Sequence, residues 1–478
     1  MSRASNFFAL AALPLALLSG CMNLAPTYQQ PAAPIPAAWP APETATGAKA
    51  PLNTGWRDFF VDERLRGVVA LALANNRDLR VAALNIDRAQ AQYGITQTAL
   101  FPTVNAGASG SRTRTPGSTA SNGQTRIATQ YNANLAMTSY ELDLFGRVRN
   151  LSDAALETFF ATEETQRSTQ ISLVASVAGA WLQLAANMQR LQVARGTLES
   201  QRRSYELVRR SHELGAQSGL ALSQAQTTVE TARADAANFD SLVEQSRNAL
   251  ALLVGATPPA ELLPTDGILL AAQPASQLLA PPADLPSSVL QKRPDVLAAE
   301  HALRTSNVNI GAARAAFYPR ITLTASAGVA SNSLSALFEN GNQAWSFVPS
   351  ITLPLFDGGV NRANLRVAEL QRDIQIATYE KTLQTAFREV ADVLAERRTL
   401  SERLAAQQAL VAATSRSFEL SQALFRSGGG SYLDVLDAQR SLYTAQQSLI
   451  SLLLTEQSNR LTLYKVLGGG WSEASVDG

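Results

Sequence analysis

Four short segments of the chain alternate between apolar and small or polar residues, which is the pattern of a β-strand with two different faces. The clearest segment runs from Ile321 to Val329, where every odd position is apolar and every even position is small or polar. Residues 131–135 and the odd positions of 345–355 alternate in the same way, and 104–109 do so more weakly. The pattern predicts strands over about 101–114, 128–142, 319–332 and 345–356.

Strands of about 10 residues with one apolar and one polar face are typical of outer-membrane β-barrels. A bilayer leaves no backbone group unpaired, so only a closed sheet can be inserted there. A sandwich strand would alternate too, but no other strands are predicted on which the apolar faces could pack. Barrels made from a single chain begin at about 8 strands, so if these strands lie in a membrane, several chains must contribute to one barrel. Three chains would supply about twelve strands.

Long helical patterns separate the strands. There is no proline between Pro116 and Pro258 or after Pro354, and these stretches are rich in helix-forming Ala, Leu, Gln, Arg and Glu. Sparse aromatic residues favour narrow helix-to-helix seams over a thick core. The pattern predicts two long helices over 148–214 and 358–427, each roughly 100 Å in length, and shorter helices over 57–99, 220–254, 284–316 and 431–467.

The chain is a tandem duplication. Residues 77–104 align without gaps to 294–321, and each segment has an aromatic-proline pair near its end, Phe101-Pro102 and Tyr318-Pro319. Later landmarks keep the same order, among them Gly255 and Gly468. We therefore divide the mature chain into repeat 1 (57–257), a proline-rich linker (258–283), repeat 2 (284–468) and a tail (469–478).

The N-terminus has the features of a secretory signal. Arg3 precedes a short apolar run, and the segment ends in L-S-G-C at Cys21. This matches a bacterial lipobox, which predicts a signal peptide over 1–20 and lipidation of Cys21; the alternative is a plain signal peptide with an incidental cysteine. Cys21 is the only cysteine, so it has no disulfide partner. The proline-rich residues 21–56 are expected to form an extended tether.

Composition excludes several function classes. The formal net charge is +1, so there is no electrostatic footprint for nucleic acid. Two histidines and one cysteine leave little material for a metal site or for nucleophilic catalysis. No Ser/His/Asp or paired-carboxylate constellation can be defined. We expect no enzyme activity, no metal and no cofactor other than the lipid on Cys21.

The stretch 427–441, SGGGSYLDVLDAQRS, carries the most specific side-chain pattern. Ser427, Gly428, Gly429 and Gly430 interrupt a helix, and Ser431 with Asp434 forms a capping box for the next one. Leu433, Asp437 and Arg440 then share one stripe of that helix. The stretch could be a phosphate cradle, a structural hairpin or a pore constriction. The cradle fails because a helix precedes the glycines and no lysine follows in motif position.

Repeat 1 has an equivalent turn over 214–220. In this sister turn, Gln224 and Thr227 occupy the places of Asp437 and Arg440. Only the turn of repeat 2 therefore carries charge, which predicts a gate that is asymmetric between the repeats. The turn residues that we expect to contact a partner are Leu214, Gly215, Ser218, Gly219 and Leu220 in repeat 1 and 427–430 in repeat 2.

Several segments together resemble the TolC-like outer-membrane factors, in particular the OprM/NodT-type lipoprotein branch. They are the lipobox, YELDLFGRVRN, LPSSVLQKRPDVLAAEHAL, AAFYPRITLTASAG, LPLFDGGVNRANL, YLDVLDAQRSLYTAQQ and the terminal LGGGW. The resemblance covers essentially the full length. It implies a homotrimer with a 12-stranded outer-membrane barrel and a periplasmic α-helical barrel, and a passive duct for drugs or other small molecules.

The resemblance also implies partners and roles. The partners are a periplasmic membrane-fusion adaptor, an inner-membrane pump of the RND type and outer-membrane lipid. Asp437 and Arg440 match the positions that constrict the periplasmic mouth, Leu433 forms an apolar ring, and Arg426 matches a latch of the closed state. Asp434 could add a second ring, although capping is the favoured role. A solvated helix face with an internal ion pair is the alternative for the stripe.

Two other functions stay open on sequence alone. A coiled-coil lipoprotein that bridges membrane layers without transport would need the helices but not the strands. The duct of a metal-efflux or type I secretion system would share the whole architecture. The transported substrates cannot be read from the residues.

Overall fold

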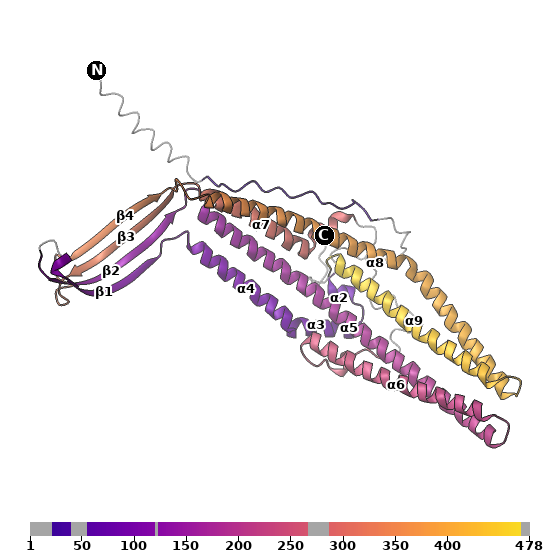
Figure 1. The fold of residues 1–478 in the computed structure, drawn as a ribbon. Coiled ribbons are helices and arrows are strands. Elements are labelled where there is room, and N and C mark those ends of the chain that lie inside the picture. Colours follow the sequence, from indigo (N-terminus) through magenta and orange to yellow (C-terminus); the bar gives the residue numbers. More distant parts are fainter. Residues whose placement is uncertain (1–21, 40–54, 120–122, 266–285, 470–478) are drawn as a thin grey trace. The chain divides into compact units, whose positions relative to one another are not determined.

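The computed structural model describes residues 22–39, 55–119, 123–265 and 286–469 (Figure 1). The chain forms two compact units. The strand unit comprises residues 1–32, 85–163 and 298–380, and the helical unit comprises 33–84, 164–297 and 381–478. The predicted signal peptide, the lipidation site Cys21, most of the linker and most of the tail lie outside the described residues.

From α4 in repeat 1 and α7 in repeat 2 onward, the two repeats have the same order of helix, two strands and two helices. Repeat 1 has α2 (Trp56–Phe59), α3 (Glu63–Asn75), α4 (Arg77–Thr98), β1 (Val104–Thr115), β2 (Arg126–Leu142), α5 (Arg147–Glu213) and α6 (Gly219–Val254). Repeat 2 has α7 (Pro294–Ala315), β3 (Arg320–Ser331), β4 (Gln343–Thr352), α8 (Val360–Arg426) and α9 (Tyr432–Val466). Most of these elements begin and end within a few residues of their predicted bounds.

The four strands form one antiparallel sheet in the order β1-β2-β3-β4, as Figure 1 shows. The register places apolar residues opposite one another: Val104, Met137, Ala325 and Phe347 form one row across the sheet. The other face is polar, and the Ser326 and Ser346 hydroxyl oxygens are 2.8 Å apart on it. The predicted alternation is confirmed, and β1 and β4 are the two edges of the sheet.

The helical unit has a compact core, so narrow seams alone were an incomplete expectation. Trp56, Phe59 and Trp181 are buried with apolar residues of α3, α5, α6 and α9. The Phe59 ring stacks on Tyr464 with centroids 3.8 Å apart. A few aromatic residues are enough to build this core because the fold brings them together in one buried cluster.

The helices predicted over 57–99 and 284–316 are both interrupted, which corrects the sequence-based assignment. In repeat 1 the chain leaves the helix at 60–62, between α2 and α3, and again at Asn76. The Asn76 side-chain oxygen accepts a hydrogen bond from the Leu79 amide at 2.8 Å, and its side-chain amide donates to the carbonyl of Leu253 at 2.8 Å. In repeat 2 a short 3-10 helix (Ser287–Lys292) precedes α7, and Arg293 donates to the carbonyl of Val466 at 2.8 Å. Both residues are extended, and each binds a carbonyl at the end of the hairpin helix in its own repeat, Leu253 being the penultimate residue of α6 and Val466 the last residue of α9.

One described helix, α5, contains an 18-residue window that is apolar enough to cross a membrane, and 61% of that window is buried inside the protein. The same helix contributes Trp181 and its neighbours to the core. Packing within the helical unit therefore accounts for this apolar stretch.

The described part of the predicted tether is extended but docked. In the strand unit, Asn307 donates a hydrogen bond to the carbonyl of Pro26 at 2.7 Å, and the Tyr28 hydroxyl donates to Glu300 at 3.2 Å. In the helical unit, the Trp39 ring stacks on Phe387 with centroids 5.5 Å apart. Residues 22–39 are therefore held against helices rather than free.

Candidate gate at the helical hairpin tips

The two hairpin turns close with the same backbone geometry. After α8, the Gly428 and Gly429 amides donate to the carbonyls of Phe425 and Leu424 at 3.1 and 2.9 Å, which is a Schellman motif. Gly428 has φ +81°, a conformation that glycine adopts without steric cost. After α5, the Gly215 and Ala216 amides bind the equivalent carbonyls, both at 2.8 Å.

Ser431 begins α9 with a complete capping box. Its hydroxyl oxygen accepts a hydrogen bond from the Asp434 amide at 3.2 Å, and the Asp434 carboxylate accepts one from the Ser431 amide at 3.2 Å. In repeat 1, Ser218 caps α6 with the Ala221 amide at 3.1 Å, but no carboxylate returns the bond because the third position is alanine. The geometry supports a capping role for Asp434.

The predicted stripe of α9 faces away from the rest of the helical unit. Leu433 is 51% exposed, and the side chains of Asp437 and Arg440 are 66% and 63% exposed. The opposite side of the same turns is buried through Tyr432, Val435, Leu436, Ala438 and Gln439. The helix is thus anchored by one face and presents a leucine, an aspartate and an arginine on the other.

Within one chain, the charged members of the stripe interact only weakly. Arg440 Nη1 lies 3.8 Å from Asp437 Oδ1, and both groups are exposed to solvent. A surface pair of this kind contributes about 0.5 kcal/mol or less. Either charged group could leave this pair for another partner at a small cost in free energy, because both side chains are exposed and the pair is weak.

Arg426 is the last residue of α8 and has no ion-pair partner among the described residues. It lines a cavity of about 190 Å³ between α5, α8 and α9, together with Arg203, Phe425 and Tyr432. The structure therefore places Arg426 close to the start of α9, in the region of the stripe but not paired with it.

An apolar cluster joins the two hairpins just behind the turns. Val208 of α5 and Ala225 of α6 pack against Tyr432, Val435 and Leu436 of α9. Tyr432 is 4% exposed, and burial raises the pKa of its hydroxyl to about 12. The sister turn is more apolar at its surface, where Leu214 is 85% and Leu220 is 68% exposed.

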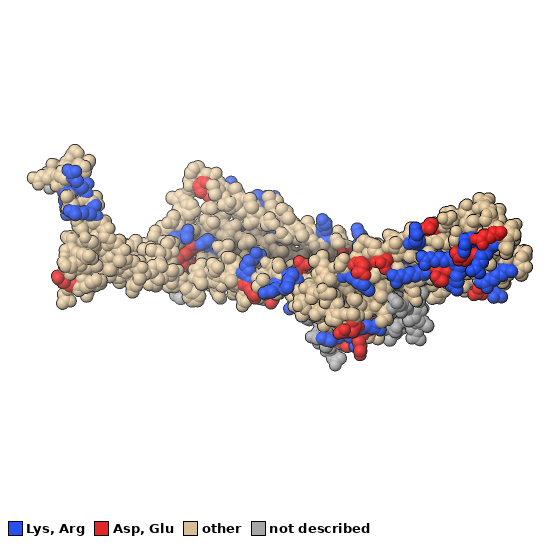
Figure 2. Space-filling view, turned by 90° about the horizontal axis from the view of Figure 1, so that it is seen from below, with Lys and Arg blue, Asp and Glu red and all other residues tan. Residues whose placement is uncertain are grey.

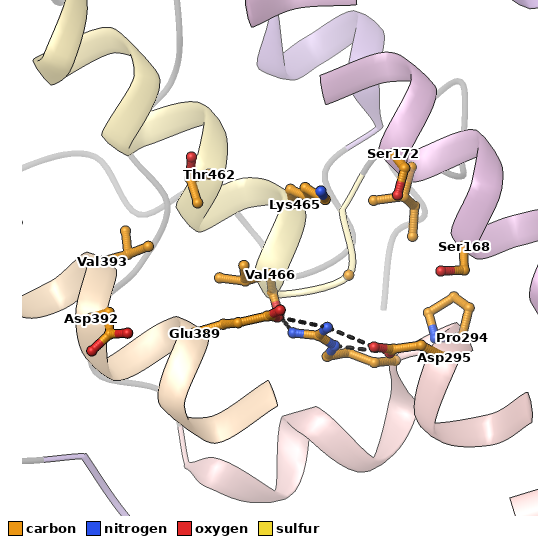
Figure 3. A pocket seen from close by; sticks show the side chains of 13 residues that line it. Ser168, Ser172, Pro294, Asp295, Glu389, Asp392, Val393, Thr462, Lys465 and Val466 are labelled. Carbon is orange, nitrogen blue, oxygen red and sulfur yellow. Dashed lines mark hydrogen bonds and ion pairs between the residues drawn. The ribbon is translucent and has the colours of Figure 1, made fainter. Parts of the chain in front are cut away.

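Figure 3 shows a second cavity, of about 440 Å³, where α5, α7, α8 and α9 meet. The Arg293 guanidinium binds both carboxylate oxygens of Asp295 at 3.0 and 2.7 Å and the carboxylate of Glu389 at 3.0 Å. Burial lowers the pKa of Arg293, but the hydrogen bonds and charges of its two carboxylate partners outweigh burial and raise it.

In the sequence, Arg293 stands out only as part of a family signature, and Asp295 only in that signature and as a position shared by the two repeats. Their partners Glu389 and Val466 are far away along the chain, so no local pattern indicates the contact. The predicted gate and turn residues, by contrast, lie together at the tips of the hairpins. No group of three or more potential metal-ligating side chains occurs among the residues that the structure describes.

Comparison with known proteins identifies relatives over nearly the whole chain. The model of the family described as "Outer membrane efflux protein" matches residues 68–256 and 285–469, one match in each repeat. The antibiotic efflux pump outer membrane protein ArpC of Pseudomonas putida is 46% identical over 465 residues, covering 96% of this chain and 94% of the relative. Outer membrane protein OprJ of Pseudomonas aeruginosa is 42% identical, covering 98% and 96%.

Solved structures have the same fold. A membrane protein from Pseudomonas aeruginosa superposes with a TM-score of 0.87 at 42% identity, covering 94% of this chain and 98% of that chain. The open state of the MtrE outer membrane channel of Neisseria gonorrhoeae gives a TM-score of 0.85 at 37% identity, with 96% and 100% covered.

Proposed function

Because this chain belongs to the outer membrane efflux protein family, and is the outer-membrane component of an efflux system rather than an enzyme, we propose that three copies form one continuous duct gated at the hairpin tips. The observation that carries the proposal is the sheet. Four strands with one apolar face leave the β1 and β4 edges without partners in a single chain.

A barrel closed across subunits would give both edge strands, β1 and β4, a hydrogen-bonding partner. The apolar face exposes Trp345 (80%), Phe347 (58%) and Ile351 (69%), which a lipid bilayer would cover. An edge strand cannot stay unpaired in lipid, and pairing β1 of one copy with β4 of the next satisfies every edge. Three copies give about twelve strands, an even number above the minimum of about 8.

The first experiment measures assembly and conductance together. Native mass spectrometry of the protein purified from outer membranes should give the mass of three chains, and the same preparation should form channels in planar bilayers. A monomer, or a trimer without conductance, would overturn the proposal of a duct.

We place the constriction of that duct at the Leu433, Asp437 and Arg440 stripe. Its support is that the fold buries the other face of α9 and leaves these three side chains uncommitted. In a ring of three copies, Asp437 carboxylates would repel one another and Arg440 could bind across the interface, since arginine forms strong charge-assisted bonds. Arg426, unpaired in the described chain, is available as a further latch.

We further propose that the turns dock onto a periplasmic adaptor that links the duct to an inner-membrane pump of the RND type. The exposed Leu214 and Leu220 of repeat 1 provide apolar contact, and 427–430 provide the matching turn of repeat 2. Leu214→Ser with Leu220→Ser should abolish efflux in cells while leaving bilayer conductance unchanged. Full efflux by this double variant would remove these leucines from the interface.

The lipid anchor is proposed on Cys21, which follows the signal-peptide pattern directly. Palmitate labelling in cells should be lost in Cys21→Ala, and labelling that persists in this variant would contradict the anchor. Channel formation by the variant would show separately whether the barrel inserts without it.

Small apolar or amphipathic molecules are the proposed cargo, because relatives at 46% identity are described as toluene and antibiotic efflux proteins. A strain that carries an intact pump and adaptor but lacks its duct should regain tolerance to toluene and antibiotics when it expresses this protein. Restored tolerance to a metal salt alone would instead favour a metal-efflux system.

A further inference from the structure

The end of the β1-β2 hairpin that lies away from α4 and α5 carries a group of basic residues. Arg112 and Arg114 lie near the end of β1, Arg126 begins β2, and all three are exposed. None has an ion-pair partner among the described residues. Figure 2 shows one group of basic side chains at an end of the molecule, and the only acidic residue within 104–140 and 320–352 is Glu339.

The strand register determines which face each arginine occupies. Val104, Ala106 and Ala108 are opposite Met137, Leu135 and Ala133, and this row of β2 is in turn opposite the apolar row of β3 that ends at Val329. Side chains two residues apart share a face. Arg112 and Arg114 therefore continue the apolar face, while Arg126, opposite Thr115, lies on the polar face.

The order of residues on the apolar face matches the layers of a membrane. The apolar run from Ile321 to Val329 spans roughly 27 Å along the strand, similar to the apolar band of about 25 Å in outer-membrane barrels. Above it comes a row with Tyr131, Ser331 and Gly110, as in the aromatic girdle at an interface. Arg112 and Arg114 follow at the level of the lipid head groups.

We propose that Arg112 and Arg114 bind the phosphate groups of lipid A in the outer leaflet. The strand ends that carry them are opposite to those that join α4 and α5, so with the helices in the periplasm these arginines face outward. Arginine binds phosphate in a bidentate manner, and lipid A displays phosphates on the sugar that sits directly above its acyl chains. The inference rests on the barrel proposed above.

The test uses the purified full-length trimer in mild detergent with diphosphoryl lipid A as the probe. Native mass spectrometry should detect bound lipid A on the parent, and Arg112→Gln with Arg114→Gln should weaken binding by about tenfold or more for each lost charge-assisted contact. Arg126→Gln is the matched control and should bind like the parent. Trimer mass and conductance, recorded on the same samples, separate loss of the lipid site from failure of the barrel.

Three outcomes would overturn the proposal. The double variant could retain lipid A as well as the parent, or Arg126→Gln could lose it equally, which would indicate a diffuse charge effect. Free pyrophosphate could also displace lipid A at equal concentration, which would make the arginines a site for soluble anions rather than for a membrane lipid.

Discussion

The Asp434 carboxylate and the Ser431 backbone amide are joined by a hydrogen bond of 3.2 Å, and the Ser431 hydroxyl oxygen accepts the reciprocal bond from the Asp434 amide. This pairing uses Asp434 at the start of α9 and leaves Asp437, one turn later, without a structural task in the chain. The two aspartates should therefore respond differently to substitution.

Removal of the cap should loosen the tip without opening it. Ser431→Ala deletes the N-cap at a cost of about 1 kcal/mol, which corresponds to roughly fivefold faster hydrogen exchange in the first turn of α9. Asp434→Ala should act in the same direction, and the conductance of both variants should match the parent. A conductance rise in Asp434→Ala would give this residue a place in the gate.

Neutralising the stripe should open the closed state. Asp437→Asn and Arg440→Gln should each raise single-channel conductance severalfold, because each removes one side of the proposed contacts between subunits. The increase should shrink in high salt, since exposed charges are screened. Gln224→Ala and Thr227→Ala are the matched controls in repeat 1. If the charged variants conduct like these controls, the gate lies elsewhere.

Arg293 should be among the most sensitive positions of the helical unit. Its side chain is 11% exposed, and Arg293→Met would leave Asp295 and Glu389 without their cation and the Val466 carbonyl without its donor. The side chains of Asp295 and Glu389 are 36% and 40% exposed, so solvent screens part of the interaction. We expect a loss of about 1–3 kcal/mol, which thermal or denaturant unfolding of the purified protein would detect.

The control for Arg293 is Arg388 of α8, whose partner Asp392 lines the same cavity. Arg388 lies 3.4 Å from Asp392, with both side chains largely exposed, so Arg388→Met should cost less than about 1 kcal/mol. Equal losses of unfolding free energy for the two variants would show that the Arg293 interactions stabilise the fold no more than an exposed ion pair does.

Alkaline pH should weaken the packing behind the turns. The pKa of Tyr432 is 10.0 in the unfolded chain and about 12 in the folded one. Because the folded pKa is the higher, the stabilisation is complete below about pH 10 and is lost as the pH rises through about 12. Hydrogen exchange at the tips should accelerate in this window, and Tyr432→Phe should reduce the acceleration. If exchange accelerates equally in the parent and in Tyr432→Phe, a group other than Tyr432 causes the effect.

The strands and long helices could be predicted because their signals are local. Alternation from Ile321 to Val329 defines two faces, and the register confirms them. The stripe of Leu433, Asp437 and Arg440 follows from helical spacing alone, and its exposure agrees.

The breaks at Asn76 and before Pro294 show where local signals end. Pro294 marks the second break in the sequence, but Asn76 lies in a continuous helical pattern, and no glycine or proline is nearer to it than Gly67. Asn76 stops the helix through a bond to Leu253, and a contact with a distant residue leaves no periodic signal. The contacts of Arg293 with Glu389 and Val466 could not be predicted for the same reason, since these residues are distant along the chain.

The open edges of the sheet have a consequence for cells that produce two versions of this protein. If three chains must pair edge to edge, a chain with a defective β4 disables every assembly that it enters. With equal amounts of intact and defective chains, random mixing would leave roughly one-eighth of the trimers fully intact. Loss-of-function variants in the strands should therefore be genetically dominant, whereas variants that never leave the inner membrane should be recessive.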